Sequence, residues 1–338
     1  MGSVAKKHII SPMATGNGAY IVHRLLENHL PEYRVSGYHP NWTFLPFLLP
    51  KVASTYKASL IHTTPDYAIF FHRKSLPLVI SFQNYVLDDW MRPYSSWIQR
   101  LHYSSDLRLW TLLAVKKAHA ITAVSEFTAR LARQNLNISQ PIEIIYNSVD
   151  ADIFAPQSFS NKTQKDIRVF YSGNLTRRKG ATLLPAIAAK LQKNIRIFYT
   201  QGLRTRNILP SVSNLHPIGP VPFEEMPNRY NQMDILLMPT VREGLSLAVL
   251  EAMACGLPVV ASDCSSLPEQ IDNRKGGFLC PVGDVDAFAA KINLLADSPR
   301  LRKEMGQYNR SKVKRLYTLE GMVKKYQTMF EKILSKRL

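Results

Sequence analysis

The sequence predicts an α/β protein with two domains, each built on a parallel sheet. The chain has 338 residues, a length that suits two domains of about 150 residues each. Apolar residues make up 46% and charged residues 20%, so each half can bury a core. Short apolar runs alternate with amphipathic stretches, which is the pattern of repeated β-α-β units.

The first half carries this alternation from its start. We expect strands at 8–11, 60–62, 78–82, 120–124 and 142–146. We expect helices at 20–29, following a turn of small residues at 14–18, and at 126–134. The stretch 95–117 predicts one or two helices with a strongly apolar face: Trp97, Ile98, Leu101, Leu109, Trp110 and Leu113. Of these, Trp97 and Trp110 are expected to be core residues.

The pattern lapses between 150 and 166, where the sequence is polar and aperiodic like a linker. It resumes with strands expected at 168–171, 195–199, 235–238, 258–261 and 277–279, and helices at 183–191 and 245–255. We therefore expect a first domain at 1–155, joined by a C-terminal helix at 319–338, and a second domain at 156–318.

The charge is strongly positive, with 43 Lys and Arg against 25 Asp and Glu and a net charge of +18. Such a chain attracts nucleic acid, an anionic membrane or a phosphorylated substrate. No nucleic-acid-reading motif is present, so we expect no nucleic-acid partner and hold a nucleic-acid-binding protein as a lesser alternative. The 3 cysteines have neither zinc spacing nor a disulfide framework, which favours a cytoplasmic location. No apolar run is long enough to span a membrane.

The segment 239–256, P-T-V-R-E-G-L-S-L-A-V-L-E-A-M-A-C-G, follows an expected strand and opens an expected helix. A helix N-terminus presents free amides and a positive dipole end, which suit phosphate or sugar oxygens. Glu243 lies in the turn, and Glu251 lies about two helical turns further on. Two carboxylates so placed can bind two parts of an extended ligand. The alternative is a helix-capping Glu and an unrelated, partly buried Glu.

The segment 171–180, Y-S-G-N-L-T-R-R-K-G, follows the first strand of the second half. Gly173 and Gly180 let the backbone come close to a ligand. Arg177, Arg178 and Lys179 supply positive charge, which a diphosphate leaving group needs as its bond breaks. The alternative is an ordinary basic loop.

Together the two segments resemble the glycosyltransferases of family 4, which have the GT-B fold of two Rossmann-like domains whose parallel sheets face across a cleft. Residues 173–180 match the family's G-R-L-x-x-x-K-G loop except at Asn174, and Glu243 and Glu251 match its E-x(7)-E motif. Four further family-like elements occur in the right order, at 123–128, 145–150, 234–239 and 276–284. The resemblance covers nearly the whole chain.

The resemblance implies a transferase that takes a UDP- or GDP-sugar in its second domain and retains the anomeric configuration, the leaving phosphate helping to deprotonate the acceptor. Lys179 and Arg178 would neutralise the diphosphate in place of a metal, so no cofactor is expected. Glu243 would contact the donor sugar with the amides after Gly244, and Glu251 would bind the ribose. The remaining donor-side residues would be Gly16, Gly18, Gly173, Arg177, Gly219, Val221, Leu245 and Ser246. Gln83 and Asn84 would lie on the acceptor side.

Two departures from the family pattern bear on activity. Asn174 replaces the usual Arg, and neighbouring Arg177 or Arg178 can take over its charge. Gln83 stands where the family often has His, and Gln cannot carry a proton charge. The alternative is a glycosyltransferase-like protein without activity that acts as a scaffold.

Two D-x-D sequences match a metal-binding pattern of another glycosyltransferase class. Asp150-Ala-Asp152 falls at the expected linker, and Asp284-Val-Asp286 precedes an expected helix that Asp caps well. We expect neither pair to bind a catalytic metal.

Basic and aromatic residues are interleaved in the first half. Basic residues near an anionic leaflet contribute about 1 kcal/mol each. The stretch 42–51 is aromatic and apolar, and basic side chains alternate with tryptophans further on: His72, Arg73, Lys74, Trp90, Arg92, Trp97, Arg100, Arg108 and Trp110. The resulting hypothesis is a peripheral enzyme on the inner face of the plasma membrane that extends a glycan or lipid-linked acceptor, such as a lipopolysaccharide precursor.

Overall fold

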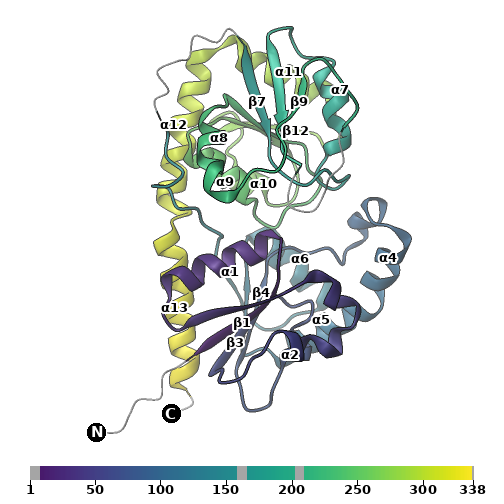
Figure 1. The fold of residues 1–338 in the computed structure, drawn as a ribbon, viewed down its shortest axis with the longest axis vertical. Coiled ribbons are helices and arrows are strands. Elements are labelled where there is room, and N and C mark those ends of the chain that lie inside the picture. Colours follow the sequence, from purple (N-terminus) through teal and green to yellow (C-terminus); the bar gives the residue numbers. More distant parts are fainter. Residues whose placement is uncertain (1–7, 158–165, 202–208, 337–338) are drawn as a thin grey trace. The chain divides into compact units, whose positions relative to one another are not determined.

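The structure, a computed structural model, describes residues 8–157, 166–201 and 209–336. The chain divides into two compact units (Figure 1). Unit 1 comprises Met1–Asn147 with Glu320–Leu338, and unit 2 comprises Ser148–Leu319. No helix within the described residues is long and apolar enough to cross a membrane.

Unit 1 is built on a six-stranded sheet of order β2-β1-β3-β4-β5-β6, in which every pairing is parallel. The strands are β1 (Ile9–Ala14), β2 (Tyr33–Tyr38), β3 (Leu60–Thr63), β4 (Leu78–Phe82), β5 (Ala120–Ala123) and β6 (Ile142–Ile144). The helices are α1 (Gly18–His29), α2 (Leu49–Val52), α3 (Ala68–Phe71), α4 (Trp97–Ser104), α5 (Asp106–Lys117), α6 (Glu126–Leu136) and α13 (Leu319–Ser335). The edge strand β2 is an addition to the predicted strands.

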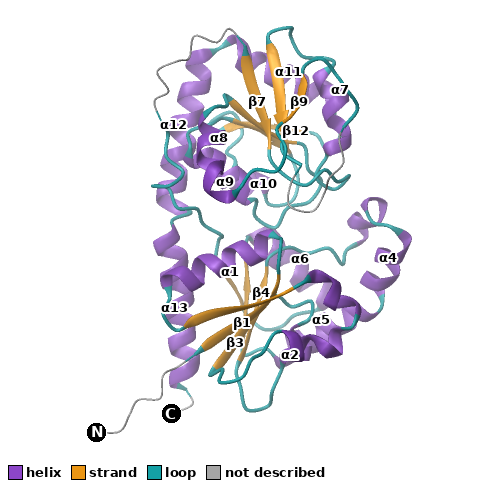
Figure 2. Ribbon diagram, in the orientation of Figure 1, coloured by secondary structure: helices purple, strands orange, loops and turns teal. Residues whose placement is uncertain are grey.

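Unit 2 repeats the plan with the order β12-β11-β10-β7-β8-β9, again parallel throughout (Figure 2). Its strands are β7 (Ile167–Tyr171), β8 (Ile195–Tyr199), β9 (Leu215–Pro217), β10 (Ile235–Met238), β11 (Val259–Ser262) and β12 (Gly277–Cys280). Its helices are α7 (Leu184–Ala188), α8 (Met226–Asn231), α9 (Leu247–Ala254), α10 (Leu267–Gln270), α11 (Val285–Asp297) and α12 (Pro299–Leu316). The two parallel sheets with their helices confirm the α/β fold, and β9 was not predicted.

The core strands show why the apolar runs fold as they do. All five residues of β4 and all four residues of β10 are buried. A strand covered on both faces reads as a continuous apolar run instead of an alternating one. Those two strands are therefore the most readable from sequence.

The boundary between the units lies at 147/148, not at 155. Val149 forms a β-bridge with Thr318, and Phe154 is buried against Phe223 and Tyr230. Residues 148–155 are thus part of unit 2, and the linker-like composition marks only the stretch after them. Residues 158–165 of the expected linker lie outside the described residues.

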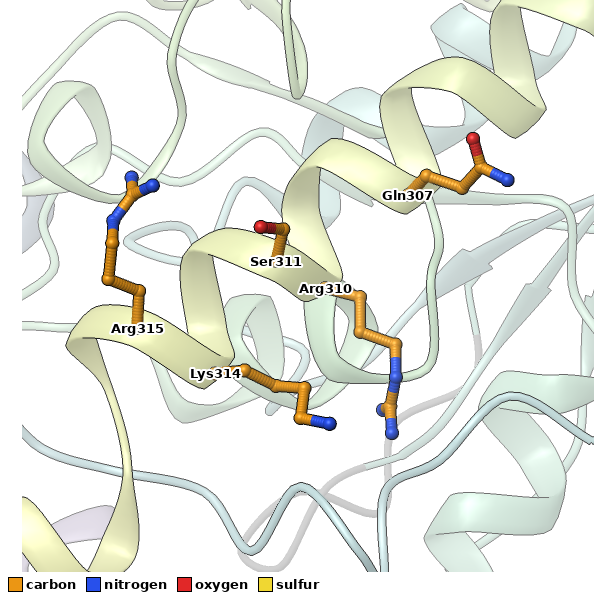
Figure 3. A pocket seen from close by; sticks show the side chains of 5 residues that line it. All are labelled: Gln307, Arg310, Ser311, Lys314 and Arg315. Atoms are coloured by element: carbon orange, nitrogen blue, oxygen red, sulfur yellow. The ribbon is translucent and has the colours of Figure 1, made fainter.

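Arg310, on α12, binds the segment 148–155 through hydrogen bonds. Its Nη1 lies 3.2 Å from the carbonyl oxygens of Ala151 and Phe154 and 2.6 Å from that of Ala254. Arg310 also borders a shallow depression of about 450 Å³, lined by Gln307, Arg310, Ser311, Lys314 and Arg315 (Figure 3). Because the guanidinium is engaged by three backbone carbonyls, we assign it a structural role.

The stretch 95–117 forms two helices, and one expectation for it is wrong. Ser105, with φ −108° and ψ −99°, separates α4 from α5. No residue of α4 is buried, and Trp97 is 72% exposed where a core position was expected. Trp110 on α5 packs edge-on against Phe70 and is partly buried. The break at Ser105 turns α4 away from the sheet, and helical periodicity alone does not show such a break.

Candidate active site

The two segments singled out by sequence meet at the carboxyl ends of β7 and β10, which are neighbours in the sheet. Ligands of open α/β sheets bind at this edge. Gly180 allows the loop after β7 to lie against the loop after β10, because a Cβ at this position would lie 1.9 Å from the carbonyl oxygen of Pro239. Its φ of +73° also lies in the left-handed region that favours glycine. A hydrogen bond of 2.9 Å from the Val241 amide to the Arg178 carbonyl joins the two loops.

Lys179 and Glu243 form an ion pair across these loops. Lys179 Nζ lies 2.7 Å from Glu243 Oε1, and the two side chains are only 16% and 8% exposed. Burial disfavours the Glu243 carboxylate, but the Lys179 ammonium, the Arg178 guanidinium and hydrogen bonds from Lys179 and Thr240 outweigh it. The pKa of Glu243 is therefore lowered, so the group is charged at neutral pH.

Arg178 serves the same loop. Its Nη1 donates to the carbonyl of Arg242 at 2.8 Å, directly before Glu243. The structure thus brings together Lys179, Arg178 and Glu243, the three residues for which the sequence analysis expected a catalytic role. Two positive side chains and one carboxylate at a sheet edge can bind a polar ligand that carries both hydroxyls and negative charge.

Three hydroxyl side chains that the sequence analysis did not select hold Glu243. Thr240 Oγ1 lies 2.9 Å from Glu243 Oε1 and is itself buried. Ser265 Oγ accepts from the Glu243 amide at 3.0 Å, and Ser266 Oγ donates to the Glu243 carbonyl at 3.2 Å. Ser265 adopts a φ of +52°, a strained value for a residue with a side chain. The only sequence signal for Thr240 is its place just beyond a buried strand.

Glu251, the second glutamate of the motif, lies on α9 and accepts a 2.7 Å hydrogen bond from Tyr230 Oη. Burial raises the pKa of Glu251 to about 7, although the Tyr230 hydrogen bond opposes the shift. Tyr230 comes from α8 and is fully buried. No sequence spacing links it to Glu251, so this partner was not predicted.

Two hydrogen bonds with Gln270 hold the turn between Glu243 and α9. The Ser246 amide donates to Gln270 Oε1 at 2.9 Å, and Gln270 Nε2 donates back to the Ser246 carbonyl at 2.9 Å. In this structure the Gln270 side chain thus binds the amide of Ser246, one of those expected to contact the donor sugar. Gly244 and Leu245 are buried beside it.

The remaining donor-side residues of unit 2 lie after β7 and β9. The Gly173 amide donates to Thr200 Oγ1 at 3.1 Å, and the Asn174 carbonyl accepts from Tyr171 Oη at 3.0 Å. Arg177 is exposed to solvent. Gly219 has a φ of +73° and its carbonyl accepts from the Gln201 amide, while Val221 is partly buried two residues later.

The predicted residues of unit 1 occupy the carboxyl ends of two of its strands. Gly16, with a φ of +72°, follows β1, and Gly18 begins α1. Asn17 between them caps the helix by accepting from the Tyr20 amide at 2.8 Å. Gln83 and Asn84 follow β4, and the buried Nε2 of Gln83 has no hydrogen-bond partner among the described residues.

The D-x-D sequences have local roles. Asp284 Oδ1 accepts from the Ala287 amide at 2.9 Å and so caps α11, as predicted. Asp150 Oδ1 accepts from the amides of Asp152 and Ile153. Across the ranges that the structure describes, no three His, Cys, Asp or Glu side chains gather as a metal site would require.

Comparison with known proteins agrees with this geometry. Residues 7–153 match the family profile described as Glycosyltransferase Family 4, and residues 166–298 match the one described as Glycosyl transferases group 1. The chain belongs to glycosyltransferase family 4. It is 23% identical over 233 residues to N-acetyl-alpha-D-glucosaminyl L-malate synthase of Bacillus anthracis, covering 65% of this chain and 61% of that protein. It is 26% identical over 275 residues to O-antigen chain mannosyltransferase B of Escherichia coli, covering 78% of this chain and 66% of that protein.

This chain therefore spans about three fifths to two thirds of the length of these relatives. Among solved structures it resembles HepE of Anabaena in complex with UDP and glucose, with a TM-score of 0.77 and 16% identity over 96% of this chain and all of that one. That likeness confirms the GT-B fold of the family member.

Proposed function

We propose that this family 4 protein transfers a sugar from a nucleoside-diphosphate donor to a glycan or lipid-linked acceptor. The observation that carries the proposal is the buried contact of 2.7 Å between Lys179 and Glu243 at the carboxyl edge of the unit 2 sheet. Burying an ion pair is costly and adds little stability, so a functional role explains it better than a structural one. The inactive scaffold has no comparable support, because it requires neither charge.

Lys179 and Arg178 are the groups that would bind the diphosphate. Negative charge grows on the leaving diphosphate as the glycosidic bond breaks, and fixed positive charge in a water-poor site stabilises that growth. The exposed Arg177 adds charge at the rim of the same loop. Because side chains can supply this charge, the proposed reaction proceeds without a metal.

Glu243 and Glu251 would hold the rest of the donor. In this proposal Glu243 accepts hydrogen bonds from hydroxyls of the donor sugar, and the contacts of Lys179 and Thr240 with Oε1 orient the carboxylate. Glu251 binds the ribose hydroxyls, and the Tyr230 hydrogen bond fixes its carboxyl. In the proposed reaction the nucleoside diphosphate leaves from the same face of the donor sugar to which the acceptor oxygen bonds, so configuration is retained and the departing phosphate accepts the acceptor proton.

The donor is proposed to be a UDP- or GDP-sugar. HepE was solved with UDP, which favours a uridine donor on fold-level analogy. The similarity to an O-antigen mannosyltransferase supports an acceptor in lipopolysaccharide-like cell-envelope synthesis. Such an acceptor is lipid-linked, and we accordingly propose a peripheral location on the inner face of the plasma membrane.

The test is release of the nucleoside diphosphate from purified protein mixed with a panel of UDP-, GDP- and ADP-sugars. The expected result is release from one donor that persists with a chelator and is lost in Lys179→Ala and Glu243→Ala. Lys190→Ala is the matched control, because Lys190 also pairs with a carboxylate of unit 2 but at an exposed site. Silence across the panel, together with no thermal shift by any nucleotide, would overturn the proposal in favour of the inactive scaffold.

A further inference from the structure

Large apolar side chains are exposed in two stretches of unit 1. Of the 15 exposed large hydrophobic residues in the described chain, only Ile153, Phe223, Leu294 and Leu316 belong to unit 2. The other eleven, 15 minus 4, lie within 42–56 and 90–113: Trp42, Phe44, Leu45, Phe47, Tyr56, Trp90, Trp97, Ile98, Leu101, Leu109 and Leu113. We call this set the apolar face. Its concentration in one unit sets it apart from the scattered exposed leucines of any soluble surface.

The two stretches belong to one side of the unit. The helix α2 within the first stretch packs on α3, and α3 packs on α5. The helix α5 in turn packs on α4 (Figure 2). Trp110 of α5 contacts Tyr67 and Phe70, the latter on α3, which joins the second stretch to the first. The exposed side chains are therefore carried by a connected set of short helices rather than by unrelated loops.

The helix α4 is the clearest sign that the apolar face has a partner. It is eight residues long and none of its residues is buried; His102 attaches it to Trp110 of α5 and to Tyr67. Trp97, Ile98 and Leu101 are 72%, 59% and 62% exposed. A capping box between Ser96 and Gln99 starts the helix, but isolated helices of this length are marginal in water. An apolar environment that covered these exposed side chains would stabilise the helix further.

The charges among these helices identify that environment. Within 42–57 and 88–117, which hold the apolar face and its flanks, the basic residues are Lys51, Lys57, Arg92, Arg100, Arg108, Lys116 and Lys117. The acidic residues of these ranges are Asp88, Asp89 and Asp106; Asp89 pairs with Arg92 at 3.0 Å and Asp106 with His102 at 2.8 Å. Tryptophan and tyrosine beside lysine and arginine favour the headgroup region of a bilayer, and the positive excess favours anionic lipid.

We infer that the apolar face of unit 1 binds the surface of an anionic lipid bilayer, with α4 lying in the headgroup region. Trp97, Ile98 and Leu101 enter the boundary between headgroups and acyl chains, and the lysines at the end of α5 contact the lipid phosphates. This inference gives the proposed peripheral location a specific surface, but it does not depend on the proposed transfer reaction. Vesicle binding and donor turnover are separate measurements, so failure of one is distinguishable from failure of the other.

The test uses the full chain with phosphatidylglycerol vesicles, and phosphatidylcholine vesicles for comparison. All 4 tryptophans lie within 42–56 and 90–113, so tryptophan fluorescence reports on these two stretches of unit 1. We expect cosedimentation with the anionic vesicles, a blue shift, and quenching by lipids brominated near the headgroup. Raising the salt concentration should weaken binding. No binding to anionic vesicles at low salt would overturn the inference.

Two variants assign the binding to the apolar face. W97S/I98S/L101S removes no buried side chain, so the fold is expected to persist and vesicle affinity to fall at least tenfold. The matched control I153S/L294S/L316S changes three exposed apolar residues of unit 2 and should bind as the wild type does. Similarly, K51Q/K116Q/K117Q should lose most of the salt-sensitive binding, whereas K303Q/K314Q/R315Q on α12 should not.

Unchanged binding by the α4 variant would overturn the inference, as would equal loss in both members of either pair. A dimer in solution that the α4 variant abolishes, without vesicle binding by the wild type, would instead assign the face to a second copy of the chain. Donor turnover in solution, without vesicles, should be the same in the α4 variant and the wild type.

Discussion

Lys179 and Glu243 are 64 residues apart in the sequence, yet Nζ of the lysine lies 2.7 Å from Oε1 of the glutamate. The contact depends on Gly180, which lets the Lys179 loop touch the backbone at Pro239. The Lys179 ammonium lowers the pKa of the Glu243 carboxyl, and the Glu243 carboxylate in turn orients the ammonium. The two residues are therefore expected to act in the reaction as one unit.

The first prediction concerns that unit. Lys179→Met and Glu243→Gln should each lower kcat for donor turnover by about 10²–10³-fold, the range seen when a preorganised charge partner is lost. The double variant should lose little more than the worse single one, because residues that act together are not additive. Nucleoside-diphosphate release under saturating donor measures this. Strictly multiplicative losses would show that the two groups work independently, and the exposed pair changed in Lys190→Met and Asp286→Asn serves as the control.

The second prediction assigns a positioning role to Thr240. Its hydroxyl has one proton to donate and lies 2.9 Å from Glu243 Oε1 and 3.0 Å from the Arg178 carbonyl. Thr240→Val keeps the shape and removes the hydroxyl, so kcat should fall about tenfold, equivalent to about 1.4 kcal/mol, with KM little changed. Thr240→Ser should restore most of the activity. If Val lowers only the melting temperature and leaves kcat intact, the hydroxyl serves the fold alone.

The third prediction concerns two buried histidines in unit 1. Between the helix α1 and the sheet, Tyr33 Oη lies 2.8 Å from His23 Nδ1 and 2.7 Å from His62 Nδ1, and both imidazoles are fully buried. Burial lowers the pKa of His23 to about 3, and burial with the neighbouring His23 lowers the pKa of His62 well below 6.5. In the unfolded chain both titrate near 6.5, so below that pH the unfolded chain binds more protons. Unit 1 should therefore keep its full stability above pH 6.5 and lose up to about 1.4 kcal/mol per pH unit per histidine as the pH falls.

Urea unfolding followed by tryptophan fluorescence measures this, because every tryptophan lies in unit 1. His23→Gln should reduce the slope of stability against pH between 6.5 and 5. The exposed His39, changed to Gln, should leave the slope as it is. A slope unaffected by His23→Gln would show that the acid sensitivity arises from other groups.

The sequence was most informative where one segment determines the outcome. The apolar runs of β4 and β10 predicted buried strands because a strand covered on both faces needs no other signal. The edge strand β2 reads Y-R-V-S-G-Y, with a glycine and an arginine inside it. It forms because β1 offers a free edge, as every one of its residues pairs with β1. The residues of β2 alone therefore did not predict the strand, because it depends on pairing with β1.

The same distinction separates the site residues. Lys179, Arg178 and Glu243 were selected through motif spacing within two short segments, and the fold brings those segments together. Tyr230 and Ser265 were not selected, because each acts on a glutamate that lies in another segment. Thr240 lies only three residues before Glu243 in the same segment, but the motif spacing does not include it. The exposure of Trp97 was also not predicted. Periodicity shows which face of a helix is apolar, but it does not show whether that face packs against a core.

The last prediction uses the raised pKa of Glu251, about 7 against an ordinary 4.5. The folded protein holds this proton more tightly than the unfolded chain does, so the stability it contributes is full below pH 4.5 and is lost as the pH rises to 7. Glu251→Gln mimics the protonated form and can still accept from Tyr230. Unit 2 of this variant should match the wild type near pH 4.5 and exceed it at pH 8 by on the order of 3 kcal/mol. Calorimetry across this range measures the difference. A constant offset between the two proteins would mean that Glu251 has the same pKa in the folded and unfolded chains. At neutral pH its hydrogen bond to Tyr230 would then hold a carboxylate in place before any ribose arrives.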